Sequence, residues 1–172
     1  MLKGYIQVYT GDGKGKTTAA LGLALRAAGA GLSVYFAQFI KQGEYSEIKA
    51  LKSFSNRITL EQFGRGRFIT GEPASEDLAA ARAGLEKVRA AMESGAYDVI
   101  VLDEANGAVQ VGLFPVSDLL EIMDAKPGGL ELVITGRGAH DKVVARADLV
   151  TEMREIKHYY AGGVAARTGI EK

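Results

Sequence analysis

The chain has 172 residues, of which 47% are hydrophobic and 24% charged, values typical of a globular protein. Its 21 basic and 21 acidic residues give zero net charge, which argues against nucleic acid or an anionic membrane as its main partner. The absence of cysteine excludes disulfides, an iron–sulfur cluster and a thiol nucleophile, and two histidines far apart in sequence argue against zinc.

A glycine-rich loop lies between the first expected strand, Tyr5–Tyr9, and the first expected helix, Thr18–Ala28. It reads Thr10-Gly11-Asp12-Gly13-Lys14-Gly15-Lys16-Thr17-Thr18. Such a loop points backbone N–H groups at a phosphate, and the helix N-terminus adds its positive end. Lys16 reaches the phosphates and the Thr17 hydroxyl ligates Mg²⁺. Although Thr10 replaces the first glycine of G-x-x-x-x-G-K-[ST], the order of strand, loop and helix favours a nucleoside triphosphate over a glycine-rich hairpin.

The second expected strand, Leu32–Phe39, ends beside this loop and is followed by Ile40 and Lys41. Gln38 and Lys41 are candidate ligand contacts; the alternative is that Phe39 and Ile40 belong to the core and Lys41 faces solvent. A short helix, Tyr45–Ser53, and a weaker edge-strand candidate, Ile58–Phe63, come next. The following loop, Phe63-Gly64-Arg65-Gly66-Arg67-Phe68, is either a ligand contact or a surface loop whose phenylalanines touch the core.

The longest expected helix, Ser75–Ser94, precedes the strand Val99–Leu102, which leads into Asp103 and Glu104. An apolar strand that ends in carboxylates, in a chain with a phosphate loop, is the Walker B arrangement. One carboxylate then holds Mg²⁺ directly or through water. The alternative is a polar strand end with one helix-capping aspartate, and the phosphate loop favours the metal.

The remaining expected elements are a helix, a strand, a short helix and a strand, at Val116–Asp124, Leu130–Ile134, Asp141–Arg146 and Leu149–Met153. Thr135-Gly136-Arg137-Gly138 follows the first of these strands and places Arg137 where a cation would face the phosphates. A structural turn with an exposed arginine is the alternative. From Lys157 onward the chain is expected to be a loop rich in glycine and alanine.

Continuous apolar runs separated by helices predict a doubly wound α/β domain with a mainly parallel sheet of five or six strands, buried on both faces. We expect a single phosphate-loop NTPase domain of the RecA-like type over residues 1–172. Ligands bind such folds at the carboxyl ends of the strands, where the motifs above lie. With no signal peptide or membrane span visible, the expected compartment is the cytoplasm.

Five segments together resemble the phosphate-loop corrinoid adenosyltransferases, which act on cob(I)alamin or cob(I)yrinic acid a,c-diamide. They run from residue 10 to residue 171 in the family's order, and Thr10 at the first glycine position is also similar to that family. The segments are Thr10–Thr18, Gln38–Lys41, Val101–Glu104, Ile134–Gly138, and Lys157-His158 with Gly163, Ala166 and Gly169–Glu171 behind it.

The resemblance implies transfer of the 5′-deoxyadenosyl group of ATP to the Co(I) of a reduced corrinoid, with release of triphosphate, in adenosylcobalamin biosynthesis or salvage. Co(I) carries no proton, so the enzyme needs no general base. It needs charge stabilisation on the triphosphate and alignment of cobalt with the ribose C5′. The resemblance also implies Mg²⁺ or Mn²⁺ as cofactor, a transient flavoprotein reductant and a homodimer, with no nucleic acid or membrane partner.

The residue roles implied by the motifs and the resemblance fall into four groups. Lys16 and Glu104 are the expected catalytic residues, and Thr17, Asp103 and Glu104 the expected metal ligands. In the family a glycine–aromatic loop packs under the corrin ring and eases reduction of Co(II). Phe63 and Phe68 of that loop are therefore expected corrinoid contacts, and Gln38 and Lys41 at the end of the second strand are also expected to contact the corrinoid. The expected nucleotide contacts are Gly11, Asp12, Gly13, Lys14, Gly15, Lys16, Thr17, Thr18 and Arg137.

Two other function classes are weighed against this one. A small-molecule kinase with a phosphate loop would need an arginine-rich lid, for which Arg65–Arg67 is the only candidate. An ATPase module that binds DNA is disfavoured by zero net charge and the lack of a basic stripe.

Overall fold

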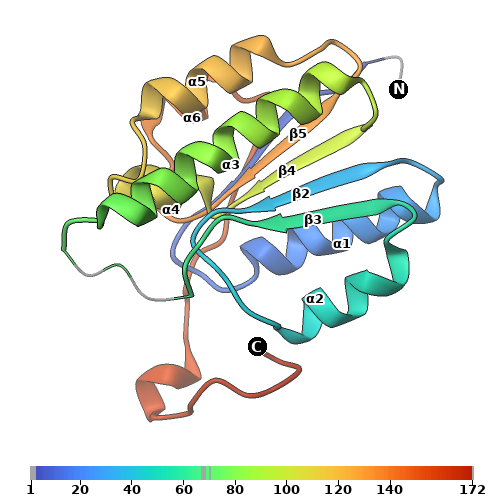
Figure 1. Ribbon diagram of the computed structural model, residues 1–172. Helices are drawn as coiled ribbons and strands as arrows, with labels where there is room; N and C mark the ends of the chain where they lie inside the picture. The colour runs from blue at the N-terminus through green and yellow to red at the C-terminus, as the bar shows by residue number, and fades with distance from the viewer. Residues whose placement is uncertain (1–2, 67–68, 70, 172) are drawn as a thin grey trace.

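The computed structural model describes residues 3–66, 69 and 71–171, and it has one sheet between two layers of helices (Figure 1). No described helix combines the length and the apolar character needed to cross a membrane. The elements in chain order are β1 (Ile6–Thr10), α1 (Lys16–Gly29), β2 (Val34–Gln38), α2 (Ser46–Leu51), η1 (Lys52–Phe54), β3 (Ile58–Gln62), α3 (Ser75–Ser94), β4 (Val99–Asp103), α4 (Ala105–Gln110), α5 (Val116–Ala125), β5 (Glu131–Thr135), α6 (Asp141–Arg146), β6 (Leu149–Glu152) and η2 (Tyr159–Gly162).

The sheet has six parallel strands in the order β3-β2-β4-β5-β1-β6. The chain leaves β1, crosses to the far side of the sheet to form β2 and β3, and fills the gap later with β4 and β5. The carboxyl ends of β1, β2, β4 and β5 therefore meet at one edge. The register places Gln38 opposite Asp103 and Tyr9 opposite Thr135, so polar groups far apart in sequence converge there.

Each face of the sheet is covered by its own helical layer (Figure 1). On one face, α3, α4, α5 and α6 pack on inward-facing residues such as Ile100 and Leu132. On the other face, α1 and α2 cover Phe36 and Val101. The side chains of Ala20, Ala24 and Ala27 are buried on α1, and their small size lets this helix lie close to the strands.

The predicted α/β sheet and its strands are confirmed, and Ile58–Gln62 is an edge strand as expected. One expectation was wrong, and one helix was missed. The strand β6, expected to be buried on both faces, is exposed at all four residues, because it is the last strand of the sheet and has β1 as its one neighbour. The six-residue helix α4, directly after Glu104, was not predicted.

After β6 the chain leaves the sheet and forms a tail that lies below the rest of the molecule in Figure 1. The tail closes on itself, since the Tyr159 hydroxyl and the Arg167 guanidinium both bind the Glu171 carboxylate. Lys14 Nζ lies 3.4 Å from Ile170 O and joins this tail to the phosphate loop. The end of the chain is thereby held beside the motifs of the sheet edge.

Candidate active site

Glycines fix the shape of the phosphate loop. Gly11 and Gly15 have φ values of 90° and 118°, in the left-handed region that favours glycine. A Cβ atom on Gly11 would lie 2.4 Å from Met153 O, and one on Gly13 would lie 2.7 Å from the same oxygen. Gly13 N donates to Met153 O at 2.7 Å. The loop thus packs tightly against the segment that follows β6, and larger residues at positions 11 and 13 would push it away.

Lys16 starts α1 and keeps its ammonium group inside the loop. The residue is 6% exposed, and its Nζ donates to Gly11 O and Gly13 O, both at 2.7 Å. Burial lowers the pKa of the Lys16 ammonium and the charge of Arg137 lowers it further, while nearby carboxylates oppose the shift. A buried ammonium held by neutral carbonyls gains from an anionic partner, so the loop is prepared for phosphate.

Asp103 ends β4 and is fully buried. Its Oδ1 accepts hydrogen bonds from the hydroxyls of Thr17 at 2.9 Å and Thr135 at 2.7 Å. Its Oδ2 accepts one from Gln38 Nε2 at 3.1 Å. The phosphate-loop hydroxyl and the Walker B carboxylate are thus in direct contact, and both offer the hard oxygen atoms that Mg²⁺ prefers.

The donor set around Asp103 fits Mg²⁺ bound largely by water and nucleotide. The described part of the chain contains no group of three or more acidic or histidine side chains that could hold a metal by themselves. Mg²⁺ usually keeps several waters and binds through one or two protein ligands together with substrate phosphates. The Thr17 hydroxyl beside the buried Asp103 carboxylate matches this usual coordination of Mg²⁺.

Glu104 has a strained backbone next to this carboxylate. Its φ of 60° makes it the one non-glycine residue with positive φ among those described. Its N–H donates to Thr135 Oγ1 at 3.0 Å, which helps hold the strained turn in place. Burial raises the pKa of the Glu104 carboxyl, and the charge of Asp103 raises it further. Strained backbone and raised carboxyl pKa values are both common at functional sites, so Glu104 stays a predicted site residue.

Replacing Glu104 with Gln is expected to stabilise the protein at neutral pH. The folded protein holds a proton on Glu104 more tightly than the unfolded chain does, so the ionised carboxylate destabilises the fold above its raised pKa. We expect Tm to rise by about 2–4 °C, the shift that about 1 kcal/mol produces in a chain of this length. Thermal melts of both proteins across pH are the measurement.

The pH dependence of that gain is its control. As the pH falls through the raised pKa, wild-type Glu104 becomes protonated and resembles Gln. The difference in Tm should therefore shrink and vanish below the ordinary glutamate pKa of 4.5. An equal or lower Tm for Glu104→Gln at pH 7 would show that the ionised carboxylate does not destabilise the fold.

Arg137 lies in the loop after β5 and faces the same cavity as Lys16. Its Nη2 donates to Asp12 O at 3.1 Å, which ties this loop to the phosphate loop. Gly136 has a φ of 127°, and a Cβ there would lie 2.7 Å from Gly107 N. The structural turn, which was the alternative reading of this segment, is thus present. The same turn also brings Arg137 to the cavity.

Gln38 and Lys41, the two predicted corrinoid contacts on β2 and just after it, lie around Asp103. Gln38 is fully buried, donates to Asp103 and accepts from Gln62 Nε2 at 2.9 Å. Lys41 Nζ donates to Thr17 Oγ1 at 3.3 Å and lies 4.0 Å from Asp103 Oδ2. Corrinoid contact by either residue stays a prediction; in this structure Gln38 bonds Asp103 and Gln62, and Lys41 contacts Thr17 and Asp103.

Phe63 packs on the core rather than standing free. Its ring lies 5.9 Å from the Phe39 ring, and a Cβ on Gly84 of α3 would lie 2.7 Å from Phe63 Cγ. This is the core contact that the sequence left open as an alternative, and corrinoid binding by Phe63 stays a prediction. Phe68 lies outside the described residues.

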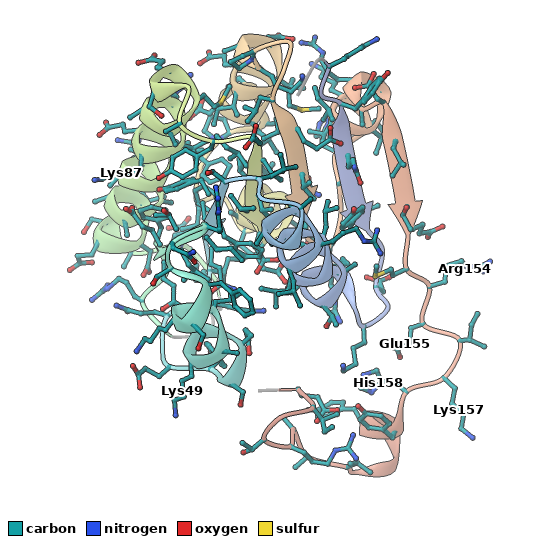
Figure 2. All side chains as sticks on the ribbon, turned by 90° about the vertical axis from the view of Figure 1, so that its right-hand side faces the viewer. Lys49, Lys87, Arg154, Glu155, Lys157 and His158 are labelled. Atoms are coloured by element: carbon teal, nitrogen blue, oxygen red, sulfur yellow. The ribbon has the colours of Figure 1, made fainter. Side chains whose placement is uncertain are left out.

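One cavity of about 650 Å³ brings most of the predicted site together. The sequence did not assign several residues of its wall, which come from α1, the loop before α2, α2 itself, α4 and the tail. These are Leu21, Tyr45, Glu47, Gly107, Gln110, Val111 and Ile170. His158 also lines the cavity, and in Figure 2 it turns inward whereas Lys157 points away. In the sequence, the Lys157-His158 segment pointed to the tail as part of the site, whereas no motif pointed to α4.

Comparison with known proteins gives a consistent result. A family model described as ATP:corrinoid adenosyltransferase BtuR/CobO/CobP matches residues 2–171. Corrinoid adenosyltransferase CobA of Salmonella typhimurium is 34% identical over 169 residues, which cover 98% of this chain and 86% of that protein. A corrinoid adenosyltransferase of Escherichia coli is 32% identical over 169 residues, with the same two coverages.

Among solved structures, the flagellar accessory protein FlaH from Methanocaldococcus jannaschii is similar in fold. Its TM-score is 0.60 at 14% sequence identity, and the match covers 88% of this chain and 72% of FlaH. At that identity the likeness concerns the arrangement of strands and helices alone.

Proposed function

The chain belongs to the ATP:corrinoid adenosyltransferase family and transfers the adenosyl group of ATP to a corrinoid, and we propose that this transfer takes place in the phosphate-loop cavity. One observation carries the proposal. The buried Lys16 and its neighbour Thr17 line one cavity, and the Thr17 hydroxyl donates to the buried carboxylate of Asp103 at 2.9 Å. That arrangement suits a metal-bound triphosphate.

The reaction requires stabilisation of the negative charge on the departing triphosphate more than it requires proton transfer. A bond forms between the cobalt of the reduced corrinoid and the ribose C5′, while the bond from C5′ to the triphosphate oxygen breaks. The electron pair of the broken bond leaves with the triphosphate. We assign the phosphate-loop amides of residues 11–18, Lys16 and Arg137 to hold the charge that develops there. Co(I) has no proton to lose, so no residue is needed as a base.

Thr17 and Asp103 are the proposed protein ligands of Mg²⁺ or Mn²⁺, with Glu104 beside them. When bound, the metal neutralises charge on the phosphates. The Gln38 amide and the Thr135 hydroxyl hold the Asp103 carboxylate in one orientation. Gln38 has no exposed surface, and we assign it this support of Asp103, while its contact with the corrinoid stays a prediction.

We place the corrinoid against apolar residues of the cavity wall, among them Ile40, Ile69 and Val111. A flat ring gains most from apolar surface, and an apolar wall gives an axial water no hydrogen-bond partner. Phe63 and Phe68 remain proposed contacts of the lower face on the basis of the family's glycine–aromatic loop.

The assembly and the cellular setting are further proposals. We propose one domain, a homodimer and a transient flavoprotein reductant, as the resemblance to the family implies; the family model spans residues 2–171. We also propose the cytoplasm as the compartment.

The products separate this function from a phosphate-loop kinase. The only described arginine of the candidate kinase lid, Arg65, lies 3.5 Å from Glu76 and 3.6 Å from Asp77 at the start of α3. Anion-exchange analysis of a reaction with ATP and chemically reduced cobalamin is the test. Intact triphosphate, one for each corrinoid consumed, is expected. ADP as the main nucleotide product would contradict the assignment.

A further inference from the structure

We propose, building on the function above, that Lys41 is an internal counter-cation that fills the metal position of the nucleotide-free enzyme and leaves it when metal and ATP bind. Its Nζ lies 3.3 Å from Thr17 Oγ1 and 4.0 Å from Asp103 Oδ2. These two residues are the proposed metal ligands. The ammonium group therefore lies beside oxygens of both residues that would hold a divalent cation.

The carboxylate of Asp103 needs a cation in the absence of metal. Its side chain has no exposed surface, and a buried carboxylate without a positive partner is strongly disfavoured. Within the described residues, Lys41 supplies the only ammonium or guanidinium nitrogen within 4.0 Å of it. Lys16 instead donates hydrogen bonds to the carbonyl oxygens of Gly11 and Gly13 in the loop.

The backbone that carries Lys41 is tied to the same carboxylate by a relay of amides. Gly43 N donates to Gln62 Oε1 at 3.1 Å, and Gln62 Nε2 donates to Gln38 Oε1 at 2.9 Å. Gln38 Nε2 completes the relay to Asp103. Because the loop is anchored in this way, Lys41 can change its partner by rotating its side chain while its backbone stays in place. That side chain is 30% exposed and lines the cavity, so it has room to rotate.

Metal and ammonium exclude one another at this position. Mg²⁺ holds its ligands at about 2.0–2.1 Å, which leaves no space for a second cation between the same oxygens. A triphosphate in the cavity offers the displaced lysine a new anionic partner. When metal binds alone, the Lys41 ammonium loses its anionic partner. When metal and ATP bind together, the triphosphate replaces that partner. The two should therefore bind cooperatively, and Lys41 should be the source of that coupling.

Mn²⁺ binding measured by electron paramagnetic resonance, without and with ATP, tests this role directly. Lys41→Met removes the charge and keeps the length, and Lys41→Arg keeps a charge. Lys49→Met makes the same charge change at an exposed position of α2 (Figure 2). Without ATP, Lys41→Met should bind Mn²⁺ at least about tenfold more tightly than wild type, or about 1.4 kcal/mol. Lys49→Met and Lys41→Arg should stay within about threefold of wild type.

The ratio of Mn²⁺ affinities with and without ATP is the second readout. It should fall in Lys41→Met and stay at the wild-type value in Lys49→Met. Unchanged Mn²⁺ affinity in a folded Lys41→Met protein, including no binding in any of the proteins without ATP, would overturn the proposal. An equal gain in Lys49→Met would do the same, since it would show an effect of net charge. None of these measurements uses a corrinoid, so a failed adenosylation assay would count against the proposed function alone.

Discussion

Replacing Lys16 with Ala should lower kcat/KM for adenosylation by at least about 10³-fold, a loss of about 4 kcal/mol of transition-state stabilisation. The expected cause is the loss of the one buried ammonium within the phosphate loop, where the leaving triphosphate gathers charge. The fold should remain, because a buried ammonium whose pKa is lowered by burial contributes little to stability. Steady-state kinetics and calorimetric titration with ATP measure both effects.

Lys87→Ala is the matched control for Lys16→Ala. Lys87 is exposed on α3, away from the cavity, and removing it makes the same change in charge (Figure 2). It should leave ATP affinity and rate within about twofold of wild type. If Lys16→Ala also kept its ATP affinity and its rate, the loop would not be the triphosphate site.

Asp103→Asn should lower kcat by about 10²-fold and raise the Mg²⁺ concentration needed for half-maximal activity, a barrier increase of about 2.7 kcal/mol. The substitution removes the buried charge that the metal requires. It also replaces one acceptor oxygen by an N–H₂ donor, which would face either Gln38 Nε2 or the two hydroxyls that now donate to Oδ1. Relieving the contact with Gln38 by turning its amide would break its bond from Gln62. Activity measured against Mg²⁺ concentration is the readout.

Asp118→Asn, in the first turn of α5, makes the same charge change away from the cavity and should keep the wild-type metal titration. A wild-type titration for Asp103→Asn as well would place the metal elsewhere. Retained metal dependence with lost ATP binding would instead point to a collapse of the loop around Thr17.

The fold could be predicted where a strand is buried on both faces, because such a strand is a continuous run of apolar residues. Central strands such as β4 are continuous apolar runs because helices cover both sides. The same pattern misled at β6, whose residues 149–152 are exposed at the edge of the sheet. Helix α4 escaped notice because its six residues include Asn106 and Gly107, which are weak helix formers. Its position is set by close packing of Gly136 on Gly107, a contact that no local pattern contains.

The site could be predicted as far as local motifs reach. The phosphate loop, Asp103 and Arg137 each follow a strand, and parallel strands bring their carboxyl ends together. The surroundings of Gln38 and Lys41 depend on which strand lies beside which. Only the register that pairs Gln38 with Asp103 and with Gln62 turns an expected ligand contact into a buried relay. Phe63 likewise looked available as an aromatic loop residue, while the gap above Gly84 gives its ring a place in the core.

Formation of a cobalt–carbon bond at the phosphate-loop cavity is most directly tested by one anaerobic single-turnover measurement. Wild type and Lys16→Ala are each mixed with ATP, Mg²⁺ and chemically reduced Co(I) cobalamin, and the visible spectrum is followed before and after illumination. We expect wild type to convert the Co(I) spectrum into that of a light-sensitive adenosylated product, and Lys16→Ala to be at least about 10³-fold slower. Formation of no light-sensitive product by wild type, or the same rate in both proteins, would contradict the transfer at this site.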